Sequence, residues 1–84
     1  DNQHLAIGAG QDLRFYHDGS HSYIDQTGTG NLYIRNTTDD KSIIIQTDDG
    51  SGGVTDYMKF KGDENLIRTF KSFRIQDSFQ LQIR

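Results

Sequence analysis

The sequence of 84 residues predicts an all-β fold of short antiparallel strands and hairpins. Runs of strand length, rich in β-branched and aromatic residues, are separated by turn-forming clusters about every 8–12 residues, which is typical of a β-sandwich, barrel or solenoid. Nowhere do apolar residues recur at the spacing of an amphipathic helix. The pair Asp18-Gly19 separates two of the runs, and Asp-Gly is among the strongest hairpin signals.

The hairpin around Asp18 and Gly19 is the central element of the chain. A type I′ loop made of these two residues would place Leu13 opposite Ile24, because the register of a hairpin follows from its loop length. Side chains alternate between the two faces of a strand, so each surface can be assigned. One surface needs a core and carries Leu13, Phe15 and Ile24, and the other carries Arg14, Tyr16, His21 and Tyr23.

The other strands are predicted from the alternation of apolar and polar residues. A short strand with Leu5 and Ile7 on one face precedes the hairpin. The later strands are expected at residues 32–35, 42–47, 57–61, 66–70, 73–75 and 79–84. The stretch 42–47 holds the only continuous apolar run, so this strand is expected to be covered on both faces. Residues 1–84 are expected to form a single module cut from a longer protein.

The composition indicates that one chain cannot complete its own interior. Apolar residues make up 32% of the sequence, whereas an ordinary globular domain has about 45–50%. The absence of cysteine excludes disulfides, so oligomerisation is the expected source of stability. The formal net charge of -3 leaves no basic stripe for nucleic acid. No apolar run is long enough to insert into a membrane.

Candidate sites are few, and the sequence predicts no catalytic residues, no cofactor and no enzymatic activity. His17 and His21 flank a turn and would leave opposite faces of the hairpin, which disfavours a metal site within one chain. His17 shares the face of Leu13 and Phe15, so in a three-fold assembly it could lie on the axis. The aspartates at 39–40 and 48–49 fit solvated turns better than calcium loops. Residues that could stack on sugars, contact another chain or shield the sheet are Tyr16, His21, Tyr23, Tyr33 and Tyr57.

Two stretches carry a resemblance to a known family. Residues 12–24 read Asp-Leu-Arg-Phe-Tyr-His-Asp-Gly-Ser-His-Ser-Tyr-Ile, and residues 29–34 read Thr-Gly-Asn-Leu-Tyr-Ile. They resemble a module of tail-fibre and related virion appendage proteins of tailed bacteriophages, in which Tyr-His-Asp-Gly-Ser and Thr-Gly-Asn-Leu recur in this order. The phrase Met-Lys-Phe-Lys-Gly-Asp at residues 58–63 also fits, and the resemblance covers residues 5–63. Phe15 stands where the family usually has an aliphatic residue.

The resemblance implies an elongated, intertwined β-fibre of three parallel chains in a virion, outside the cell. A single-chain β-solenoid or a small β-sandwich is the alternative fold. The implied function is a rigid shaft that helps to present the host-attachment apparatus, with other virion tail proteins as partners. A module that binds host surface polysaccharide and a fragment of a tail-spike depolymerase are the alternatives. The residues expected along the axis are Leu13, Phe15, Ile24, Leu32, Ile34, Ile43, Ile45, Met58, Phe60, Phe73, Ile75, Leu81 and Ile83.

Overall fold

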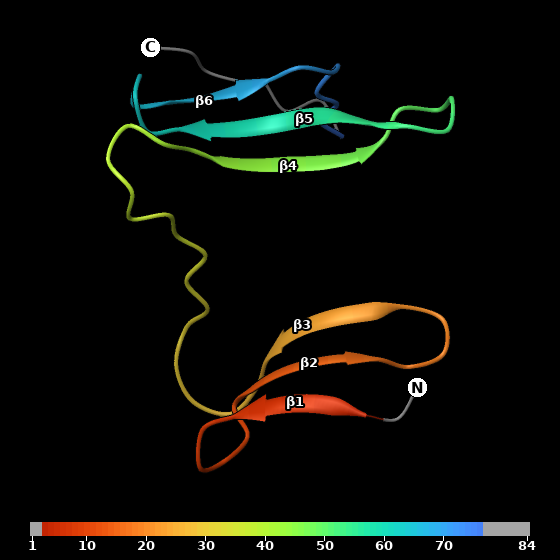
Figure 1. The fold of residues 1–84 in the computed structure, drawn as a ribbon, viewed down its shortest axis with the longest axis vertical. Helices are drawn as coiled ribbons and strands as arrows, with labels where there is room; N and C mark the ends of the chain where they lie inside the picture. Colours follow the sequence, from red (N-terminus) through yellow and green to blue (C-terminus); the bar gives the residue numbers. More distant parts are fainter. Residues whose placement is uncertain (1–2, 77–84) are drawn as a thin grey trace. The chain divides into compact units, whose positions relative to one another are not determined.

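The structure is a computed structural model that describes residues 3–76. These residues form six strands and no helix, which confirms the all-β prediction (Figure 1). The strands belong to two separate antiparallel sheets of three strands each. The chain divides into two compact units, and the boundary lies between Ile34 and Arg35.

The first sheet has the strand order β1-β2-β3. Its strands are β1 (His4–Ile7), β2 (Leu13–His17) and β3 (Ser22–Gln26). The backbone turns between β1 and β2 at Gly8, whose φ of 98° lies in the region that glycine adopts without steric cost. Leu5 and Phe15 are cross-strand partners, and Phe15 in turn pairs with Ile24. One face of this sheet is therefore apolar.

The register of the β2–β3 hairpin corrects the prediction. His17 pairs with Ser22, so the loop contains the four residues 18–21 rather than two. The cause lies in Asp18, whose carboxylate accepts hydrogen bonds from the backbone amides of Ser20 and His21, at 2.9 and 2.8 Å. Leu13 consequently faces Gln26 instead of Ile24. The shift is an even number of residues, so the predicted division of side chains between the two faces is confirmed.

The second sheet has the order β4-β5-β6. Its strands are β4 (Ile43–Asp48), β5 (Val54–Lys61) and β6 (Leu66–Thr69). The register of β4 against β5 changes between Ile45 and Gln46, because Tyr57 is an extra residue that forms a β-bulge. Three of the expected strands, at residues 42–47, 57–61 and 66–70, are thus confirmed with small changes at their ends.

Three other expectations about strands are not met, namely strands at 32–35 and at 73–75 and a covered strand at 42–47. Residues 32–35 and 73–75 are not paired into a sheet, so they are not strands. The expected strand at 79–84 lies outside the described residues. The strand β4 is not covered on both faces, because Ile44 and Ile45, which point to opposite faces, are 46% and 49% exposed. An apolar run alone does not separate a central strand from an edge strand.

Among residues 3–76, no side chain is fully buried. Of the residues expected along an axis, three are half-buried: Leu13, Ile43 and Met58. Those that are exposed in the single chain are Phe15, Ile24, Leu32, Ile34, Ile45, Phe60, Phe73 and Ile75. Leu81 and Ile83 lie outside the described residues. Within each unit, the apolar side chains therefore form a surface of the sheet rather than a core.

Candidate functional site

A row of aromatic rings crosses the polar face of the first sheet. The register places His4, Tyr16 and Tyr23 side by side on β1, β2 and β3. The rings of Tyr16 and Tyr23 stack with their centroids 4.9 Å apart, and His4 lies nearly perpendicular to Tyr16 at 5.8 Å. His21, in the loop, lies nearly perpendicular to Tyr23 at 6.5 Å. Such pairs stabilise a sheet by about 0.2–1 kcal/mol each.

The loop carboxylate of Asp18 ties this row to the turn. Its Oδ2 atom accepts a hydrogen bond from the Tyr23 hydroxyl at 2.9 Å. Hydrogen bonds from the amides of His21 and Ser20, and then from Tyr23, lower the pKa of Asp18 below its ordinary value of 3.8. The bond to Asp18 and partial desolvation raise the pKa of Tyr23 above 10.0. At neutral pH the charged carboxylate thus holds both the turn and the ring in place.

The geometry of the row limits what it can bind. Tyr16 contacts Tyr23 on one side and His4 on the other, because β1 and β3 flank β2. A sugar that stacks on an aromatic residue needs an open ring face, and Tyr16 has both sides occupied. The row is thus best explained as cross-strand shielding that fixes the register of the sheet.

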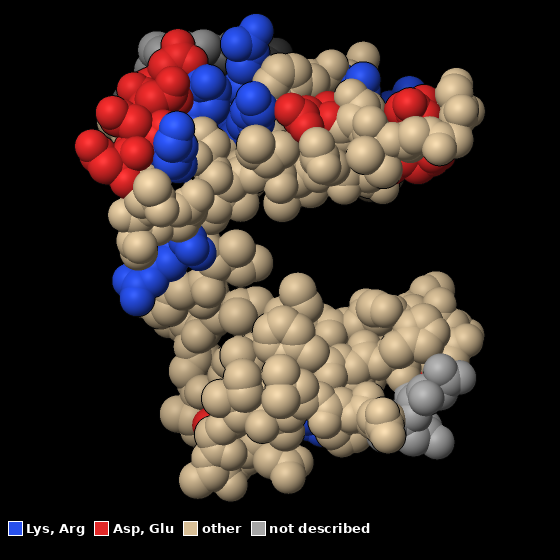
Figure 2. Space-filling view, in the orientation of Figure 1, with Lys and Arg blue, Asp and Glu red and all other residues tan. Residues whose placement is uncertain are grey.

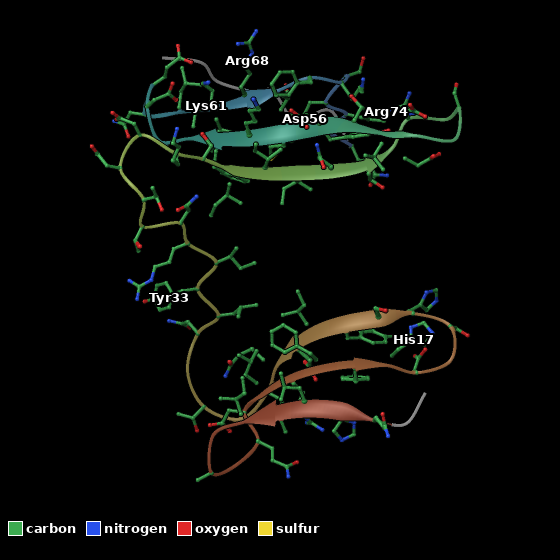
Figure 3. All side chains as sticks on the ribbon, in the orientation of Figure 1. His17, Tyr33, Asp56, Lys61, Arg68 and Arg74 are labelled. Atoms are coloured by element: carbon green, nitrogen blue, oxygen red, sulfur yellow. The ribbon has the colours of Figure 1, made fainter. Side chains whose placement is uncertain are left out.

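The five residues proposed as surface contacts come together only in part. Tyr16, His21 and Tyr23 form the row, and the sequence reasoning missed its fourth member, His4, which only the β1–β2 register reveals. Tyr33 lies on the strandless segment between β3 and β4 and is 78% exposed (Figure 3). Tyr57 donates from its hydroxyl to the Asp48 carbonyl at 2.8 Å, and Lys71 lies over its ring at 5.7 Å.

His17 lies at the end of β2 beside the turn (Figure 3). Its Nδ1 atom and the Ser22 hydroxyl are hydrogen-bonded at 2.9 Å, and the ring is exposed. Within residues 3–76, no three His, Cys, Asp or Glu side chains gather closely enough to hold a metal ion. The same part of the chain contains no helix that is long and apolar enough to span a membrane.

The loop between β4 and β5 is organised by Asp49. The Oδ1 atom of Asp49 accepts hydrogen bonds from the amides of Ser51 and Gly53, at 2.7 and 3.0 Å. These bonds lower the pKa of Asp49 below 3.8. Asp48 accepts from the amide of Gly50 in the same way, at 3.1 Å. The prediction that these aspartates form turns is confirmed, since their oxygens are directed to backbone amides.

The second sheet has one apolar and one charged face. The register places Ile43, Ile45, Met58, Phe60 and Ile67 on one face, which we call the apolar face of the second sheet, whereas Ile44 and Leu66 lie on the other face. The opposite face carries Lys59, Lys61 and Arg68. Lys61 forms ion pairs with Glu64 at 3.1 Å and Asp63 at 3.6 Å. Figure 2 shows how the charged residues gather on this unit.

Cations on the charged face are arranged around Phe70. The Lys59 ammonium lies 5.6 Å from the centre of the Phe70 ring, and the Arg68 guanidinium 5.2 Å. Lys59 also pairs with Asp56 at 3.8 Å, and Figure 3 shows Asp56, Lys61 and Arg68 on this unit. The Lys59–Asp56 pair is half-buried, and the two cations lie at cation–π distance from the Phe70 ring.

Two shallow grooves lie on the second unit. One has a volume of about 230 Å³ and is lined by Ile45, Tyr57, Met58, Thr69, Lys71, Ser72 and Phe73. The other has a volume of about 320 Å³ and is lined by Phe60, Lys61, Gly62, Asn65, Leu66 and Ile67. Neither lining includes a carboxylate, so neither groove offers the pair of acids that glycoside hydrolysis requires.

No family model, curated protein sequence or solved structure matches the chain.

Proposed function

We propose that this chain is a shaft segment of the tail fibre of a tailed bacteriophage, which acts as a homotrimer in the virion, outside the cell. The observation that carries the proposal is that each three-stranded sheet has an apolar face that its own unit does not cover. The resemblance at residues 12–24 and 29–34 supplies the virion assignment.

The physical argument is that each sheet needs a partner surface. A three-stranded sheet becomes stable when its hydrophobic face is packed against another element. On the first sheet that face includes Leu5, Phe15 and Ile24, and Ile24 is 62% exposed. The sequence contains no cysteine to compensate with disulfides. Contact between copies of the chain would remove these surfaces from water at about 25 cal/mol per Å².

The role of such an assembly is mechanical. Three parallel chains with a dry apolar axis and hydrogen bonds between their strands would form a stiff support for the host-attachment apparatus. His17 shares the apolar face of the first sheet, so in the trimer it would approach its two symmetry mates. Other virion tail proteins would join the segment at its ends.

Sedimentation equilibrium of the purified chain tests this proposal. The chain has a mass of 9.6 kDa, and we expect a particle of three times that mass. Electron microscopy of the same sample should show slender particles with three-fold symmetry. A cooperative, folded monomer at micromolar concentration would refute the proposal, because a monomer that is stable alone needs no partner.

A further inference from the structure

The strand β4 presents the least protected sheet edge of the second unit. It is six residues long and is bonded to β5 on one side only. Its first three residues are Ile43, Ile44 and Ile45, and no charged residue occurs in the strand before Asp48. Natural edge strands are usually short, charged or interrupted by proline, since an open edge pairs with other strands. The edge of β4 is therefore suited to pairing with a further strand.

Among residues 3–76, β6 is the other strand of this sheet that is paired on one side only, and its two faces match those of β4. Ile43, Phe60 and Ile67 form one row across the three strands on the apolar face. Ile44, Lys59 and Arg68 form the neighbouring row on the charged face. If β4 of a second copy lay beside β6, its Ile43 would continue the first row and its Ile44 the second. The apolar face would then continue across the junction, and on the charged face Ile44 would lie beside Arg68.

Charges at the ends of the two strands favour a parallel alignment. Lys41 precedes β4, and Asp48 and Asp49 close it. Asp63 and Glu64 precede β6, and Lys71 follows it. A parallel pair places the acidic end of β4 near Lys71, whereas the start of β4, which carries Asp39 and Asp40 beside Lys41, adds no net attraction to Asp63 and Glu64. An antiparallel pair would bring like charges together, which destabilises neighbouring strands.

From these observations we propose that β4 of one chain pairs in parallel with β6 of a second copy, so that the second sheets of three chains close into a ring. The inference rests on the trimer proposed above. Within one sheet β4 and β6 run parallel to each other, because both are antiparallel to β5. Rotation about a three-fold axis along the strands keeps the strand direction, so β4 of one copy would also run parallel to β6 of the next copy. When three such head-to-tail contacts close into a ring, none of the three sheets keeps an unpaired edge. The apolar face of the second sheet then points to the axis.

Disulfide trapping tests the junction directly, since the chain has no cysteine of its own. The double variant Ile44→Cys, Arg68→Cys places one thiol on each side of the proposed junction. Within one chain Lys59 lies between these positions, so their Cα atoms are about two strand spacings, ~9.6 Å, apart. That separation exceeds the reach of a disulfide, so only a bond between chains can form. The matched controls are the two single variants and Tyr33→Cys, an exposed position on a segment without strands.

On mild oxidation of the assembled protein, we expect the double variant to form covalent dimers and trimers about tenfold more than any control. The two single variants, mixed before assembly, should form mixed dimers. Sedimentation of the reduced double variant serves to show that it assembles. A trimer without this cross-link would overturn the junction and leave the fibre proposal standing. Dimers from Ile44→Cys alone would show pairing of β4 with β4 and would also overturn it. A folded monomer would overturn both proposals.

Discussion

Replacing Phe60 by alanine should weaken the trimer strongly, because the side chain lies on the apolar face of the second sheet. In the single chain Phe60 is 40% exposed. An aromatic side chain offers about 200 Å², so about 80 Å² per chain is left for a partner to cover. At about 25 cal/mol per Å² this amounts to ~2 kcal/mol per chain and ~6 kcal/mol per trimer.

The assay is sedimentation equilibrium over a range of concentrations. The midpoint concentration of a monomer–trimer equilibrium varies as the inverse square root of the association constant. A loss of ~6 kcal/mol therefore raises the midpoint about a hundredfold. Lys59→Ala is the matched control, because Lys59 is the neighbouring residue on β5 and points to the charged face. We expect its midpoint to change by less than about threefold, because Lys59 points away from the apolar face that the trimer would cover.

Two results would refute this reasoning. If Phe60→Ala and Lys59→Ala shift the midpoint equally, the two faces of the second sheet do not differ in the assembly. If the Phe60→Ala midpoint equals that of the parent chain, the apolar face is not covered by other copies. Circular dichroism of each variant at high concentration should show the β-structure of the parent, so that loss of folding is recognised.

Three further predictions concern the turns. Gly62→Ala should lower the free energy of unfolding by about 1–3 kcal/mol, because a Cβ atom there would collide with the Lys41 carbonyl oxygen. Urea unfolding measures this change. The control is Gly10→Ala, where the new Cβ atom meets only a side chain, and its free energy of unfolding should match that of the parent. The lowered pKa of Asp18 means that its contribution to stability is present above pH 3.8 and is lost as the pH falls through the lower folded value. In Asp18→Asn, the free energy of unfolding should therefore fall less steeply as the pH is lowered into the acid range. Acid unfolding identical to that of the parent would contradict this. Tyr23→Phe should raise the pKa of Asp18 toward 3.8 in an NMR titration while the ring stack persists; an unaltered titration would show that the Tyr23 hydroxyl does not hold the carboxylate.

The local elements of this fold could be predicted because they depend on neighbouring residues. Alternation predicted the strand at Leu5 and Ile7 and the one around Met58 and Phe60, because side chains on a strand change face at every residue. A turn at Asp18 was also predicted, because Asp-Gly is a strong hairpin signal, although the loop has four residues instead of two. The face assignment of the hairpin survived an error of two residues in its register, because an even shift preserves the alternation.

The candidate surfaces were predictable only in part. Tyr16 and Tyr23 were expected on one face, but their stacking and the contact with His4 depend on the register of three strands. In the second sheet, the regular alternation of apolar and charged residues along the sequence indicated one apolar face and one charged face. That β4 lies at the edge of that sheet, with Ile44 exposed, was not visible in an apolar run.

By itself, the amino-acid sequence determined that the chain is all-β and which side chains of the first hairpin share a face. Tertiary structure decided which strands pair, that they form two sheets, and that residues 32–35 join neither. The physical reason is the range of the interactions. Alternation and turn chemistry act between residues that are close in sequence, whereas a strand becomes part of a sheet only when the hydrogen-bonding groups of a distant segment lie beside it.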